Sequence, residues 1–449
     1  MSISEFNLKT SVLVVEYSAS MNIKVKGKQV LTGEITPSGS KNSAVALLPS
    51  TLLFDKPVVL KNVPEITDVT KLMNIMTKLG SKITWDRSKR EMKIDNSKLS
   101  FNQVEREDWN TMRGTSLLWG PMLARFGKVD FGGLPGGCTL GFRTLSPHYN
   151  AFRAMGVEIS DNEKGIKMDA KSAHASEFWL TEMSPTATEN AVMLATSING
   201  ITKIVGAASE PQVQDLCNFL NGAGASIEGV GSSILTINGG KYLSSHEHSL
   251  FSDHYEIATF LAMGAITGGG MKVYHAQADL FVKVNEIFRN FGIEINYEGD
   301  TAIVAKNQKI RLTCEEERNL LTIKAQPWPG LPVDMLPLFI AISLAAKDGQ
   351  VLFHNWMYEA GLFWTSELAK LGANIVMCDP HRIIVLAGNK LKGDTLEAPF
   401  IIRATVAMVM AAMISEGETV ILNADSLYRG HPDFAENLRR LGAKIEEIK

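Results

Sequence analysis

The chain has 449 residues, of which 45% are hydrophobic and 21% charged, and its net charge is −3. This composition is typical of an ordinary globular protein of two or three domains, and the near-neutral charge argues against wrapping nucleic acid or binding a membrane surface. Its four cysteines form neither a disulfide framework nor a metal-ligand spacing, which favours a reducing, cytoplasmic location and predicts no metal and no cofactor. They are Cys138, Cys217, Cys314 and Cys378.

Residues 1–20 are interpreted as an N-terminal extension. The apolar run from Ser11 to Tyr17 is short, and Glu5 stands where a signal peptide would carry positive charge. An uninterrupted apolar run of the roughly 18 residues that a membrane helix needs does not occur. A more regular segment begins at Met21.

A six-fold internal repeat extends along the rest of the chain. In each copy an amphipathic run, predicted to be a helix, ends at a glycine and is followed at once by a short segment typical of a strand. In LMNIMTKLGSKITW, for example, Leu72, Met76 and Leu79 share one helical face. The spacing of about 70 residues is too long for a solenoid and indicates a small α/β unit. The six glycines are Gly80, Gly156, Gly224, Gly292, Gly372 and Gly442.

Each unit also contains a second predicted helix that is apolar on nearly every side, as in MLPLFIAISLAA and ATVAMVMAAMI. Such a helix belongs in the interior of a domain, and a charge at its start must lie where water or a ligand reaches it. If these helices run parallel, their N-termini gather on one face and favour an anionic ligand. The charged residues near the six starts are Lys41, Arg113, Glu189, Asp253, Asp334 and Arg403.

Several motifs together resemble a known family. The stretches SGSKNSA, NTMRGTSLLWGP, LPVDM and YRG, with the glycine-rich loop LPGGCTLGFR, are similar to those of the UDP-N-acetylglucosamine enolpyruvyl transferases, which belong with EPSP synthase to one family. The resemblance covers about residues 21–449. It implies an α/β fold of two similar domains, each built from three repeated α/β units in an inside-out, barrel-like arrangement, with the active site in the cleft between them. We expect a discontinuous first domain, residues 21–40 plus 252–449, and a second domain, residues 41–251.

The resemblance implies transfer of the enolpyruvyl group of phosphoenolpyruvate to a hydroxyl of UDP-N-acetylglucosamine, with release of phosphate, in peptidoglycan synthesis. Cys138 matches the family's general acid and fosfomycin target, Asp334 the proposed base, and Asn42 an acceptor-binding asparagine. Arginine and lysine suit the phosphate and carboxylate of phosphoenolpyruvate. The residues that match the family's cations are Lys41, Arg113, Arg143 and Arg429, with Arg403 in the same wall.

The residues themselves support the role of the cysteine loop. Glycines permit hinge motion that would bring Cys138 to the substrate, and the nearby Arg143 would favour its thiolate. The alternative interpretation of a free cysteine is a small buried hydrophobic residue. We apply that interpretation to Cys217, Cys314 and Cys378.

Other positions depart from the family pattern and leave the acceptor open. They are Thr67 for a lysine, Gly361 for an arginine, Ile401 for an aspartate, Ser146 in the loop after Arg143, and Glu182 for a nucleotide-contacting lysine. The acceptor is UDP-N-acetylglucosamine or another hydroxyl compound, such as UMP in a secondary-metabolite pathway. A third alternative is a non-catalytic, nucleotide-binding paralogue. The expected partners are small molecules, without nucleic acid or membrane, and the oligomeric state stays open.

Overall fold

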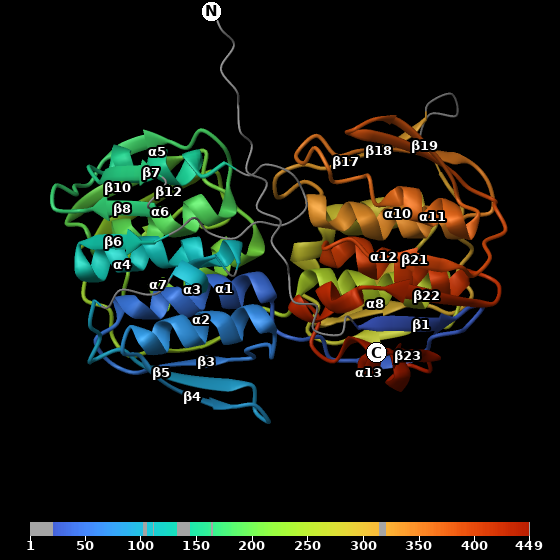
Figure 1. The fold of residues 1–449 in the computed structure, drawn as a ribbon, viewed down its shortest axis with the longest axis horizontal. Coiled ribbons are helices and arrows are strands. Elements are labelled where there is room, and N and C mark those ends of the chain that lie inside the picture. Colours follow the sequence, from blue (N-terminus) through green and yellow to red (C-terminus); the bar gives the residue numbers. More distant parts are fainter. Residues whose placement is uncertain are drawn as a thin grey trace, which may run out of the picture.

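The computed structural model describes residues 21–101, 106–110, 112–132, 144–162, 165–313 and 320–448. These residues form two lobes that lie next to each other (Figure 1). One lobe has a hydrophobic core of buried side chains between residues 44 and 250, and the other has a core from residues 23–35 and 255–445. We propose that the domain boundaries lie between residues 40 and 41 and between 251 and 252, because each core then belongs to one domain.

The described residues of the lobe 41–251, on the left in Figure 1, form three sheets. The first has the strand order β13-β3-β5-β4, formed by β3 (Val58–Lys61), β4 (Lys82–Asp86), β5 (Glu91–Asp95) and β13 (Glu247–Ser249). The second has the order β6-β8-β7, formed by β6 (Lys128–Phe131), β7 (Glu158–Asn162) and β8 (Gly165–Asp169). The third has the order β11-β12-β10-β9, formed by β9 (Glu177–Trp179), β10 (Gly200–Val205), β11 (Ile227–Glu228) and β12 (Ile234–Gly239).

In the other lobe the residues that the structure describes form three sheets of four strands each. The first has the order β15-β16-β14-β2, formed by β2 (Gly33–Ile35), β14 (Met271–Val273), β15 (Ile295–Glu298) and β16 (Thr301–Val304). The second has the order β17-β18-β20-β19, formed by β17 (Leu321–Lys324), β18 (Gln350–His354), β19 (Asn374–Asp379) and β20 (Arg382–Leu386). The third has the order β21-β22-β1-β23, formed by β1 (Asn22–Lys26), β21 (Thr395–Glu397), β22 (Glu418–Leu422) and β23 (Ile445–Ile448).

Five of the six sheets that the described residues form share one construction, which confirms the predicted repeat of α/β units. Every four-stranded sheet combines one parallel pair of strands with antiparallel neighbours. The six repeat glycines all have positive φ, between 71° and 108°, the left-handed conformation that glycine adopts without a steric penalty. Each precedes a strand by two or three residues. The amphipathic helices are α2 (Thr67–Lys78), α5 (Ser146–Ala154), α7 (Pro211–Gly222), α9 (Val282–Asn290), α11 (Thr365–Leu368) and α13 (Phe434–Arg440).

The predicted apolar helices form the centre of each lobe. In one lobe α10 packs against both α8 and α12, and all three lie side by side in Figure 1; in the other α6 packs against α1 and α4. Short 3₁₀ turns precede two of them: η2 (Arg113–Leu118) leads into α4, and η4 (Val333–Met335) leads into α10. The central helices are α1 (Lys41–Ser50), α4 (Trp119–Phe126), α6 (Pro185–Ser197), α8 (His254–Ile266), α10 (Leu336–Ala345) and α12 (Ile402–Ile414).

The expected placement of Glu189 at a helix start is wrong. Helix α6 begins earlier, because Ser184 caps it by accepting a hydrogen bond from Ala187 N–H and Pro185 occupies its first turn. Glu189 therefore lies inside the helix and is buried, and burial, together with the nearby Glu210, raises its pKa to about 8. A buried, neutral carboxyl is not a charge presented to an anionic ligand.

Among the described residues, the search for a helix long and apolar enough to cross a membrane found none.

Candidate active site

Asp253 joins the starts of two central helices that belong to different lobes. It caps α8, where its Oδ1 accepts the backbone N–H groups of Tyr255 and Glu256, each at 3.0 Å. Its Oδ2 accepts the backbone N–H of Lys41, the first residue of α1, at 3.2 Å. Burial alone would raise the pKa of Asp253, but Arg403 and neighbouring histidines hold it below its ordinary value. Asp253 is thus an ionised carboxylate at the boundary between the lobes.

Arg403, near the start of α12, is held by three partners around its guanidinium group. Its Nη2 lies 3.6 Å from Asp253 Oδ1. Its Nη1 lies 2.6 Å from His431 Nε2, and because arginine only donates, this imidazole nitrogen accepts the hydrogen bond. The guanidinium carbon lies 4.5 Å from the centre of the Tyr255 ring, within the range of a cation–π interaction. The position of the charge is therefore fixed from three sides.

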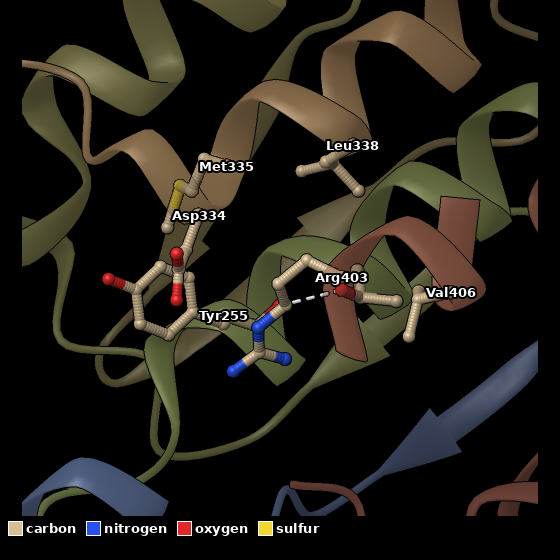
Figure 2. A pocket seen from close by; sticks show the side chains of 7 residues that line it. Tyr255, Asp334, Met335, Leu338, Arg403 and Val406 are labelled. Atoms are coloured by element: carbon tan, nitrogen blue, oxygen red, sulfur yellow. Dashed lines mark hydrogen bonds between the residues drawn. The ribbon is translucent and has the colours of Figure 1, made fainter. Parts of the chain in front are cut away.

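A cavity brings Arg403 together with Asp334, the predicted base. Figure 2 shows the Asp334 carboxylate beside the Tyr255 ring, with Arg403 extending toward both from α12. Burial, and next the charge of Asp334, raise the pKa of Tyr255 well above its ordinary value, so its hydroxyl remains protonated. Apolar side chains complete the wall. The full lining is Tyr255, Thr259, Asp334, Met335, Leu338, Arg403 and Val406.

Lys41 and Arg429 meet across the boundary between the lobes through Asp68. Lys41 Nζ lies 2.9 Å from Asp68 Oδ2, and Arg429 Nε lies 3.6 Å from Asp68 Oδ1. Arg429, the last residue of the turn η6 (Ala424–Arg429), also lies over the ring of Phe400, at 4.7 Å from its centre. Burial lowers the pKa of Lys41, whereas Lys41 and Arg429 together hold the pKa of Asp68 below its ordinary value despite its burial. Cations from both lobes are thus concentrated at one place.

The structure describes two of the remaining predicted site residues, Arg113 and Asn42. Arg113 begins η2, and its Nη2 donates a 2.7 Å hydrogen bond to the carbonyl of Thr144. Asn42 is the second residue of α1 and is half-buried. Cys138 and Arg143 lie outside the described residues. The described residues therefore place Lys41, Asp334, Arg403 and Arg429 around the lobe boundary, and connect Arg113 to the segment that follows residues 133–143.

Two other cysteines lie in the described part of the chain, one buried and one exposed. Cys217 is fully buried in α7, and burial raises the pKa of its thiol to about 12, as the interpretation as a hydrophobic residue requires. The same interpretation is wrong for Cys378, which is exposed on β19. Along β19 every second residue from Asn374 to Cys378 is exposed, so the ordinary alternation of a strand places Cys378 at the surface. Cys314 lies outside the described residues.

At Gly361 the structure has no room for a side chain. A Cβ atom there would lie 2.1 Å from Asn355 Nδ2 and 3.2 Å from the carbonyl of Tyr358. Asn355 is itself buried, and its Oδ1 accepts the backbone N–H of Tyr358 at 3.2 Å. A cation at this position would therefore require the Asn355 side chain to move.

The other departures from the family pattern are uncharged or lie at the surface. Thr67 begins α2 and is exposed. Ile401 is half-buried and packs against the core of its own lobe. Ser146, at the start of α5, accepts a hydrogen bond from the Thr144 hydroxyl at 2.8 Å, and Glu182 is exposed.

Tyr255, Asp68 and His431 are site residues that the sequence-based prediction missed. Tyr255 belongs to an apolar helix and His431 follows the YRG motif, so neither pattern indicates contact with Arg403. Asp68 could have been found from the sequence, because it directly follows Thr67, one of the positions that depart from the family pattern.

Comparison with known proteins identifies the family of this chain. The EPSP synthase (3-phosphoshikimate 1-carboxyvinyltransferase) family matches residues 25–447. A UDP-N-acetylglucosamine 1-carboxyvinyltransferase of Borreliella burgdorferi is 34% identical over 425 residues, which cover 95% of this chain and 98% of the relative. The enzyme with the same name from Treponema denticola is 35% identical over 422 residues, covering 94% and 98%.

Solved structures share the fold at low sequence identity. The enolpyruvyl transferase NikO from Streptomyces tendae superposes with a TM-score of 0.84 at 19% identity, covering 96% of this chain and 99% of that one. EPSP synthase from Acinetobacter baumannii gives a TM-score of 0.73 at 17% identity, covering 96% and 100%. The two lobes and their repeated units are thus those of an enolpyruvyl transferase fold.

The chain belongs to the EPSP synthase family. It is an enzyme of the enolpyruvyl transferase type, and the two relatives described above, 34% and 35% identical over almost the full length, are UDP-N-acetylglucosamine 1-carboxyvinyltransferases.

Proposed function

We propose that this enzyme transfers the enolpyruvyl group of phosphoenolpyruvate to a hydroxyl of UDP-N-acetylglucosamine, with release of phosphate, as a cytoplasmic step of peptidoglycan precursor synthesis. The observation that carries the proposal is the cavity in which Asp334 lies beside Tyr255 and Arg403. The near full-length identity to UDP-N-acetylglucosamine 1-carboxyvinyltransferases supports the choice of acceptor.

The proposed chemistry follows from the charges at this site. Lys41, Arg403 and Arg429 hold the phosphate and carboxylate of phosphoenolpyruvate, because cations stabilise both anions through charge-assisted hydrogen bonds. Asp334 accepts the proton of the acceptor hydroxyl as its oxygen attacks carbon 2. The loop acid, proposed to be Cys138, donates a proton to carbon 3. The tetrahedral adduct then loses phosphate, and loss of a proton from carbon 3 restores the double bond.

A different acceptor is the second candidate, and the loop at Gly361 favours it. Asn355 occupies the space that a side chain at this position would need, and Thr67 and Ile401 also carry no charge. An acceptor with fewer phosphate groups than a UDP-sugar, such as UMP, would need fewer of these contacts. Each lost charge-assisted hydrogen bond weakens binding by about 1–3 kcal/mol.

Phosphate release from phosphoenolpyruvate, measured with a panel of acceptors, tests the proposal. The panel contains UDP-N-acetylglucosamine, UMP and 3-phosphoshikimate, each at several concentrations. We expect the highest kcat/KM with UDP-N-acetylglucosamine. Efficient release with UMP and little with the UDP-sugar would contradict the proposed acceptor and establish the second candidate. An Asp334→Asn variant serves as the control, because phosphate release that survives this change would not arise from the proposed site.

A further inference from the structure

Asp68 is a buried carboxylate placed between two cations of different lobes. Its side chain is 4% exposed, and it lies in the first turn of α2, where the helix dipole favours a negative charge. Lys41 comes from the same lobe, and Arg429 from the other. The carboxylate therefore connects the lobes by ion pairing at the site assigned above to the phosphoenolpyruvate anion.

The two carboxylate oxygens of Asp68 make different contacts. Oδ2 has the short contact to Lys41 Nζ, at 2.9 Å. Oδ1 is buried and forms no hydrogen bond within the described residues, and its 3.6 Å separation from Arg429 Nε is too long for one. A buried oxygen without a hydrogen bond is unfavourable, so this carboxylate is held mainly by the charge of its neighbours.

We propose that Asp68 is a resident counter-ion of the anion site: it neutralises Lys41 and Arg429 when no substrate is bound, and it competes with the phosphate group for them during turnover. The inference rests on the proposed function, since it takes the site of Lys41 and Arg429 as the one that binds phosphoenolpyruvate. Asp68 is a positioning residue here and takes no part in proton transfer.

Two consequences follow from competition for the same cations. The carboxylate lowers the affinity of the site for phosphate and phosphoenolpyruvate, because it already occupies part of the positive potential. It also promotes departure of the product phosphate, because it pairs again with Lys41 and Arg429 as phosphate leaves. Where product release limits turnover, removing this charge slows the enzyme while tightening the binding of its anions.

The test compares Asp68→Asn and Asp68→Ser with the native enzyme. The two variants remove the same charge but differ in size and hydrogen bonding. Asp55→Asn is the matched control, because Asp55 pairs with Arg125 on the surface of the same lobe and its loss changes the total charge equally. Dissociation constants for inorganic phosphate and for phosphoenolpyruvate are measured by calorimetry, kcat and KM by phosphate release, and folding by thermal unfolding.

We expect both Asp68 variants to bind phosphate about tenfold more tightly. An affinity change of this size is near the lower end of the range for two interacting sites. The KM for phosphoenolpyruvate should fall together with kcat, whereas a structural defect would raise KM. The Asp55→Asn control should match the native enzyme.

Unchanged or weaker phosphate binding in both Asp68 variants, with binding to the native enzyme intact, would overturn this inference alone. Loss of the cooperative unfolding transition in both variants would make Asp68 a structural residue and would overturn it as well. If the native enzyme binds neither phosphate nor phosphoenolpyruvate, the proposed function fails, and this inference fails with it.

Discussion

The contact between Arg403 and Tyr255 makes a quantitative prediction about stability. The guanidinium carbon lies 4.5 Å from the ring centre, and the Arg403 side chain is only 10% exposed. A cation–π interaction is worth about 0.5–1 kcal/mol at an exposed site and about 2 kcal/mol when desolvated, so the upper value applies. Tyr255→Phe keeps the ring and loses the hydroxyl, whereas Tyr255→Leu also loses the ring.

A double-mutant cycle isolates the interaction with the ring. The Phe and Leu variants of Tyr255 are prepared in the native and in the Arg403→Met background, and the free energy of unfolding is measured by urea denaturation. We expect replacement of the ring to cost about 1–2 kcal/mol more when Arg403 is present than when it is absent. A coupling below about 0.3 kcal/mol, the range in which independent sites add, would refute the reasoning.

Three further predictions concern the loop acid, the acceptor loop and the pH dependence. Cys138→Ser should lower turnover about 10²–10⁴-fold in the phosphate assay while leaving the unfolding transition unchanged. Cys138→Asp should retain part of the turnover, because a carboxylic acid can also donate the proton. Normal turnover of the serine variant would exclude Cys138 as the acid. Gly361→Ala should lower the free energy of unfolding by about 1–3 kcal/mol, because the new Cβ would lie 2.1 Å from Asn355 Nδ2. An unchanged midpoint of urea denaturation would contradict this packing. Because burial lowers the pKa of Lys41, phosphoenolpyruvate affinity should fall as the pH rises through that lowered pKa and the ammonium loses its charge. Calorimetry across the alkaline range measures this loss of affinity. The Lys41→Arg variant should not show it, because arginine keeps its charge over this range. A loss of affinity that persists in the variant would assign the titration to another group.

The repeated units were predictable because their signals are local. An amphipathic face followed by glycine determines where a helix such as α9 ends, and Gly292 there has a φ of 71°. The central helices were equally recognisable, since a helix apolar on every side must be buried. Their charged starts predicted that Lys41 and Arg403 gather at one place, and in the structure Asp253 contacts both the Lys41 backbone N–H and the Arg403 guanidinium.

The partners of these charges were not predictable from local patterns. Asp68 meets Arg429 only because two distant segments fold against each other at the lobe boundary. In the sequence Tyr255 resembles any other residue of an apolar helix, although its ring makes a cation–π contact with Arg403. The charge of Glu189 suggested a helix start, but the cap Ser184 and Pro185 begin α6 one turn earlier.

Mass spectrometry of the acceptor, after incubation of the enzyme with phosphoenolpyruvate and UDP-N-acetylglucosamine, tests the central claim most directly. The account predicts a UDP-N-acetylglucosamine product heavier by one enolpyruvyl group, formed in proportion to the phosphate released and absent with Asp334→Asn. Phosphate release without this product, or an unmodified acceptor after prolonged incubation with folded enzyme, would contradict it.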